Sequence, residues 1–192
     1  MKKLSLFLMA LIALCFVLTP SMATAQVTIT FYSHDFGNRF PHTFITLKGT
    51  VATTGETVDT NYGFTAKNVS PAILFGSVIG VVETSKPDYI AKSDPQFALV
   101  LTDDQYAKVM GVVAEWRDRP QKSYNLNKRN CVHFVMETAA LLGLHVNRKS
   151  KYFKKPKTFL REVLKLNPTL VALSPETPEK KYKPGKVDTS RD

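Results

Sequence analysis

The sequence predicts an α+β fold in which a mainly antiparallel sheet packs against helices. Segments with alternating apolar and polar residues, rich in β-branched side chains, fill the first hundred positions. Helical patterns follow these segments rather than alternating with them, and this segregation favours an antiparallel sheet. The 192 residues, 44% of them hydrophobic, allow one ordinary domain with a tail and exclude a multi-span membrane protein.

Turn-forming residues separate the expected strands. The first strand ends before a loop at 33–41, and Thr53-Thr54-Gly55 marks a hairpin turn further on. Each segment between such breaks has the length and composition of a strand. The five expected strands are 27–32, 42–47, 56–65, 79–84 and 96–101.

Capping residues mark the expected helices. Thr102 is a favourable N-cap residue with Gln105 at the capping-box position, and Pro120 is expected to close this helix. A second helix is expected from about Cys131 to Leu142, followed by Gly143 as a C-terminal cap, and a short amphipathic piece at 159–166. The expected buried face of the first helix comprises Tyr106, Val109, Met110, Val113 and Trp116.

Residues 1–25 read as a secretory signal peptide. Two lysines precede an apolar run from Leu4 to Leu18, and Ala23-Thr24-Ala25 forms a small-x-small cleavage site. The run is shorter than a membrane span, and Cys15 within it lacks the small preceding residue of a lipoprotein site. We therefore expect an exported protein, periplasmic or secreted, of 167 residues. Cleavage removes two lysines and lowers the net charge from +10 to +8.

The remaining chain is predicted to be one domain at 26–173 and a disordered tail at 174–192. The tail is dominated by Pro, Lys, Glu and Thr, and Tyr182 is its only aromatic residue. The positive charge concentrates at 122–129 and 148–157. In an exported protein this charge favours an anionic cell-envelope polymer or lipid headgroups over nucleic acid, and a merely solvated basic face is the alternative.

Cys131 is the only cysteine left after cleavage. A lone thiol in an oxidising compartment is a liability unless it has a use. Its predicted position at a helix start, beside Lys128 and Arg129, favours the thiolate. We therefore interpret Cys131 as a catalytic nucleophile, with a buried structural thiol as the alternative.

A cysteine nucleophile needs a base, and histidine suits neutral pH. His42 begins a strand framed by core residues and is the preferred base; His34 in the preceding loop is a second candidate. His133 is expected to pack behind the cysteine, and His145 to lie on the surface. A zinc site of His34, His42 and Cys131 is an alternative without a close ligand pair, so no metal or cofactor is predicted.

Two short motifs resemble a known superfamily. Residues 130–134, Asn-Cys-Val-His-Phe, resemble the cysteine motif of lecithin retinol acyltransferase-like proteins. Residues 41–45, Pro-His-Thr-Phe-Ile, resemble the strand that carries their histidine. Both motifs belong to the circularly permuted NlpC/papain-like thiol fold, in which the histidine precedes the cysteine. The matches cover some ten residues, while element order fits over about 27–144.

The resemblance implies a third polar residue that orients the histidine. Asp59 and Asn61 share one face of the expected strand and Tyr62 has the other. Asn61 can fix an imidazole as asparagine does in papain-like enzymes, and Asp59 could do so with a charge. Asn61 is preferred slightly, because it adjoins residues 62–64, where the sheet is expected to be most buried. Val132 replaces a glutamate of the acyltransferase branch, which weakens the case for that substrate class.

The predicted function is a cysteine-dependent hydrolase or acyltransferase acting on an amide or ester. Cys131 attacks a carbonyl, His42 carries the proton, and the N–H of Cys131 helps to bind the oxyanion. A cell-wall peptide is the first substrate expected and a lipid ester the second, with a lipid acyltransferase or phospholipase as the corresponding activity. A non-catalytic envelope-binding module of the same fold is the competing hypothesis.

Overall fold

The computed structural model describes residues 26–35, 41–68, 70–119 and 123–173. The expected signal peptide, Pro120 and the expected tail lie outside these residues. The described elements are β1 (Val27–His34), β2 (His42–Thr50), β3 (Thr57–Ala66), α2 (Ala72–Phe75), β4 (Gly80–Glu83), α3 (Pro87–Ala91), β5 (Asp94–Leu101), α4 (Asp103–Arg117), α5 (Cys131–Leu141) and α6 (Pro156–Leu166).

The predicted α+β class is confirmed. Five strands form a sheet in the order β4-β3-β2-β1-β5, and every neighbouring pair is antiparallel. The strands β1 to β4 follow one another as a meander, with Gly55 at a φ of 71° in the turn between β2 and β3. The chain then crosses from one edge of the sheet to the other, because β5 pairs with β1 rather than with β4.

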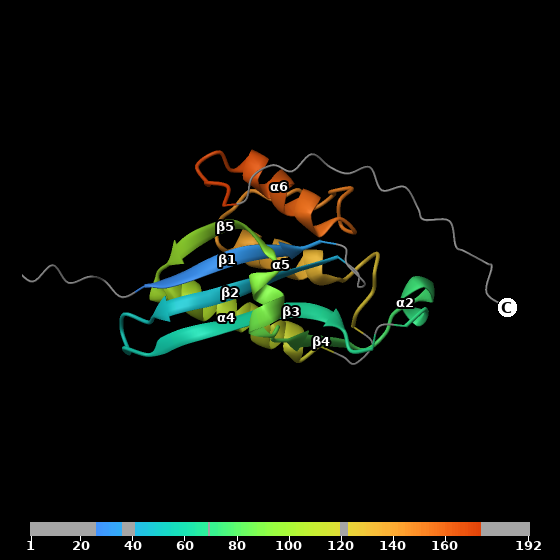
Figure 1. Cartoon of the computed structure of the whole chain (residues 1–192), viewed down its shortest axis with the longest axis horizontal. Helices are drawn as coiled ribbons and strands as arrows, with labels where there is room; N and C mark the ends of the chain where they lie inside the picture. The colour runs from blue at the N-terminus through green and yellow to red at the C-terminus, as the bar shows by residue number, and fades with distance from the viewer. Residues whose placement is uncertain (1–25, 36–40, 69, 120–122, 174–192) are drawn as a thin grey trace, which may run out of the picture.

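Different elements pack on the two faces of the sheet. Ile45 and Leu47 belong to the main core, together with residues of α4, α5 and α6. Phe44, the residue before Ile45, is equally buried but stacks on Tyr32 and contacts Tyr89 of α3. Strand alternation therefore separates a helix face under α4, α5 and α6 from a crossover face under α3. In Figure 1, α3 crosses in front of the sheet and α4 and α5 lie behind it.

The helix predicted after Thr102 is confirmed. Thr102 accepts a hydrogen bond from the Gln105 N–H and its own N–H donates to the Gln105 side chain, which completes the capping box. Trp116 is 1% exposed, stacks edge-on against Phe64 and Phe134, and donates to Glu137. The buried face of α4 thus packs on both the sheet and α5.

Two of the sequence predictions are corrected. The loop expected at 33–41 begins later, because Ser33 and His34 continue β1 by pairing with Thr43 and His42. The short helices α2 and α3 were not predicted, since four or five residues are too few to show a helical period. Within the part of the chain that the structure describes, no helix is long and apolar enough to cross a membrane.

Candidate active site around Cys131

Cys131 is the first residue of α5, directly after the N-cap Asn130. The Asn130 Oδ1 accepts hydrogen bonds from the backbone N–H groups of Val132 and His133, at 2.9 and 3.4 Å. Its amide nitrogen donates to the carbonyls of Leu126 and Phe153, at 2.9 and 2.7 Å. Asn130 therefore caps α5 and also ties the loops on either side of the helix to its start.

The Cys131 thiol is buried at the start of β2. Its side chain is 6% exposed and belongs to the core that includes Ile45. Burial raises the pKa of the thiol to about 11, although hydrogen bonds from the backbone N–H groups of Thr43, Val132 and Cys131 itself lower it. The increase in pKa from desolvation is thus larger than the decrease from the backbone N–H groups. Cys131 is therefore protonated at neutral pH in this conformation.

His42 lies on the crossover face. It pairs with His34 across β1 and β2, and its ring stacks at 6.2 Å on that of Phe44. Burial, and to a smaller extent the charge of His34, lower the pKa of His42 from 6.5 to about 4. His42 is therefore a neutral imidazole at neutral pH, which is the form that can accept a proton.

Gly63 of β3 makes room for the His42 ring. A methyl group at this position would lie 2.7 Å from the His42 Nε2 and 3.1 Å from the Phe44 Cβ. Sequence reasoning did not single out Gly63 as a site residue. Its signal was a glycine in the middle of a strand, which often marks a close approach by another group.

His34 is held by the crossover segment. Its Nδ1 lies 2.9 Å from the Ser93 Oγ, and its ring stacks on Tyr89 at 4.1 Å. Ser93 in turn donates to the Tyr89 carbonyl, so α3 and the residues after it form a compact cover over this histidine. His34 lies on the same face as His42 and thus away from α5.

The structure brings Cys131 and His42 to neighbouring positions but does not join them. The thiol meets the backbone of Thr43, the residue after His42. Thr43 and Ile45 point to the helix face, whereas His42 and Phe44 point to the crossover face. Among the described residues no hydrogen bond links the thiol to either His42 or His34.

The three candidates for orienting His42 are engaged elsewhere. Asn61 shares the crossover face, but its amide donates to the Ser85 carbonyl at 3.2 Å and accepts from the Ser85 N–H at 2.6 Å. Asp59 forms an exposed ion pair with Lys48 at 3.3 Å. Tyr62 lies on the helix face beside the main core. The group that orients His42 during catalysis therefore stays a prediction.

His133 has a structural role. It stacks on Phe153 at 4.3 Å, and its Nδ1 accepts from the Asn130 N–H at 3.3 Å to complete the capping box of α5. Burial and the neighbouring Arg129 lower the pKa of His133. Asn130, His133 and Phe134 thus serve the architecture of this part of the fold. His145 is exposed, as predicted.

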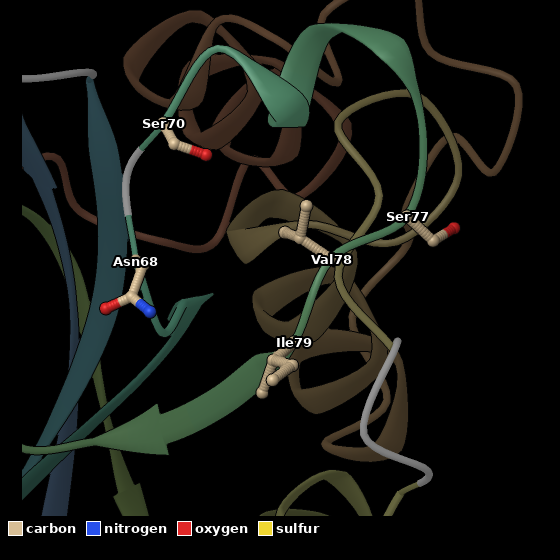
Figure 2. Close-up of a pocket in the computed structure, with 5 residues that line it drawn as sticks. All are labelled: Asn68, Ser70, Ser77, Val78 and Ile79. Atoms are coloured by element: carbon tan, nitrogen blue, oxygen red, sulfur yellow. The ribbon is translucent and has the colours of Figure 1, made fainter.

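No group of three or more His, Cys, Asp or Glu side chains gathers anywhere in the described residues. Two shallow hollows lie elsewhere on the surface. One is lined by residues between 68 and 79 (Figure 2) and the other by residues between 96 and 172, and neither includes Cys131 or His42.

Comparison with known proteins gives one structural likeness. No protein-family model matches the sequence. No curated protein matches it either. Among solved structures, the chain is similar to the crystal structure of a type VI secretion system effector, TseH, at 13% sequence identity and a TM-score of 0.49. The match covers 79% of this chain and 100% of the effector chain.

Proposed function

We propose that the protein is an exported cysteine-dependent hydrolase or acyltransferase of the permuted papain-like class, with Cys131 as nucleophile. The observation that carries the proposal is the place of the thiol. It lies at the first residue of α5, where the backbone N–H groups of Cys131 itself and of Thr43, the residue that follows His42, lower its pKa. Such N–H groups can stabilise a thiolate and then the oxyanion of an acyl-transfer intermediate.

His42 is the base of this proposal. Burial keeps it neutral, so it can take the Cys131 proton and return it to the leaving group. The His42 side chain, which packs against Gly63, must move from there toward the thiol when substrate binds. Cys131 then attacks the carbonyl of an amide or ester, the leaving group departs with the proton, and water or an acceptor releases the acyl group.

The substrate class follows from the predicted compartment. Residues 1–25 read as an export signal, which brings the enzyme to the cell envelope. Cell-wall peptides and lipid esters are the carbonyl compounds expected there. The excess of basic residues favours anionic versions of either.

A non-catalytic envelope-binding module is the second candidate. It is favoured by the thiol itself, which is 6% exposed, has a pKa raised to about 11 and bonds to no described histidine. In that case Cys131 is a core residue and binding takes place elsewhere on the surface.

Turnover by point variants separates the two candidates. Purified protein is assayed against muropeptides and phospholipids side by side, together with Cys131→Ser, His42→Ala and the control His145→Ala. We expect the first two variants to lose activity by at least about a thousandfold, because nucleophile and base act as a unit. Full activity is expected for His145→Ala, which alters an exposed residue. Turnover that survives in Cys131→Ser would contradict the cysteine mechanism.

A further inference from the structure

The segment around α2 exposes an apolar tip at one end of the sheet. Phe75 is 87% exposed and Leu74 61%, while the preceding residue, Ile73, is 5% exposed. Large exposed side chains of this kind at adjacent positions are unusual in a folded domain. In Figure 1, α2 projects beyond the ends of the neighbouring strands. The tip can therefore reach a surface before the rest of the domain does.

The base of this projection is held in place. The Lys67 N–H donates to the Ile79 carbonyl at 2.9 Å, which closes the two ends of the segment on each other. Val78 pairs with Tyr124, and the Asn125 side chain donates to the Ser77 Oγ at 3.1 Å. Figure 2 shows the hollow between the stretch of chain that leads into α2 and the stretch that leaves it, with α2 above the hollow. The tip is thus presented by a braced segment that belongs to the body of the domain.

Only basic charges lie on the projecting segment and on the loop that braces it. No acidic residue occurs between 66 and 82, or in the bracing loop at 123–130. Lys67 stands at the base of the projection, and the exposed Lys128 stands in the bracing loop. An apolar tip with lysines behind it and no acid in its own segment or its bracing loop complements a surface of negative headgroups over hydrocarbon.

We propose that this tip docks the protein on an anionic lipid bilayer, with Leu74 and Phe75 inserted into the interface and Lys128 at the headgroups. Docking on a second protein or on a second copy of this chain would not explain why the tip segment contains no acidic residue. The tip lies at the end of the sheet where β2 begins and β3 finishes. Cys131 meets β2 at this same end. On the proposed function, docking would therefore present the thiol to a substrate at the membrane surface.

Binding to vesicles tests the docking separately from catalysis. The Cys131→Ser protein is sedimented with vesicles of equal parts phosphatidylcholine and phosphatidylglycerol. The double variant Leu74→Ser/Phe75→Ser is compared with Val100→Ser. Val100 is 58% exposed but lies toward the opposite end of the sheet, where it pairs with Thr28. We expect about a tenfold or greater loss of partitioning for the tip variant and no loss for the control.

Charge and depth give two further readouts. Lys128→Glu should weaken binding about fivefold or more, whereas Lys108→Glu, on an exposed position of α4, should have a smaller effect. Phe75→Trp should show a blue shift with vesicles and quenching by brominated lipid, above the constant signal of the buried Trp116.

Three results would overturn the docking proposal: no binding to the anionic vesicles, equal binding by the tip double variant, or equal binding to pure phosphatidylcholine. Dimerisation in solution that the tip variant abolishes would assign the tip to a second copy instead. If Cys131→Ser loses turnover but still binds the vesicles, membrane docking does not depend on catalysis, and each proposal is tested by its own variant.

Discussion

Desolvation decides the chemistry of both proposed catalytic residues. The helix start favours a thiolate at Cys131, yet burial raises its pKa to about 11. Burial likewise lowers the pKa of His42 to about 4. The proton therefore stays on sulfur in the structure described. Catalysis requires that substrate binding bring the imidazole to the thiol and change the surroundings of both groups.

The pKa of His42 predicts a loss of stability in acid. Between pH 6.5 and about 4, the unfolded chain binds a proton at His42 that the folded protein does not. The free energy of unfolding should therefore fall as the pH is lowered through this window, by up to about 3 kcal/mol from this residue. Urea denaturation at both ends of the window measures the loss.

His42→Gln should show a smaller loss across the same window, because glutamine does not titrate. The exposed residue His145 provides the control, and His145→Gln should keep the dependence of the wild type. An unchanged pH dependence in His42→Gln would contradict the assignment of the buried neutral imidazole.

Gly63→Ala tests the space beside His42. The added methyl group would lie 2.7 Å from the His42 Nε2 and 3.1 Å from the Phe44 Cβ, so at least one ring must move. We expect unfolding to become easier by about 1–3 kcal/mol and turnover to fall more than tenfold. Gly111→Ala, in α4 with open space around it, should leave turnover unchanged. Wild-type turnover in Gly63→Ala would show that His42 needs no room there.

The helix starts were predicted correctly from the sequence, whereas the contacts of His42 were not. Thr102 was placed correctly at a helix start, because capping depends on residues three positions apart. Cys131 was placed correctly at a helix start from the polar loop before it. The neighbours of His42 could not be predicted. Its pairing with His34 and its contact with Gly63 depend on the register between strands that are distant in sequence.

At the scale of elements, Asn130 joins three parts of the chain. Its side chain caps α5 and binds the carbonyls of Leu126 and Phe153. We expect Asn130→Ala to destabilise the fold by about 3 kcal/mol, because it removes a cap and leaves two carbonyls without their donor. Thr102→Ala removes the exposed cap of α4 alone and should cost about 1 kcal/mol. Equal losses in chemical denaturation would show that the two extra bonds contribute nothing.

The strands and long helices were predicted from sequence, but their arrangement was not. Alternation, strand-like composition and turn residues identified the five strands, and capping and periodicity identified α4. The crossover through α3 was missed, since a five-residue helix has no clear period. Without it, nothing in the sequence indicated that β5 would join the β1 edge or that α3 would cover His34.

At the scale of the whole molecule, the domain should fold without the last residues of the chain. The tail at 174–192 has too little apolar sequence to offset the cost of ordering it. Leu173, by contrast, donates its N–H to the Gln96 carbonyl at 2.8 Å, and Leu170 packs against the core. A chain that ends at Leu173 should keep the melting temperature of the full chain, and one that ends at Asn167 should melt lower. A large loss on the first truncation would show that the tail packs on the domain.

The acyl-enzyme tests the central claim most directly. Protein mixed with a substrate that it turns over is quenched in acid and weighed by intact mass spectrometry, followed by peptide mapping. Because Cys131 is the only cysteine after the predicted cleavage, a thioester has one possible site. We expect the mass of the acyl group on the peptide that contains Cys131, and no adduct in Cys131→Ser or His42→Ala. Turnover without any adduct at Cys131, together with full activity in Cys131→Ser, would contradict the mechanism.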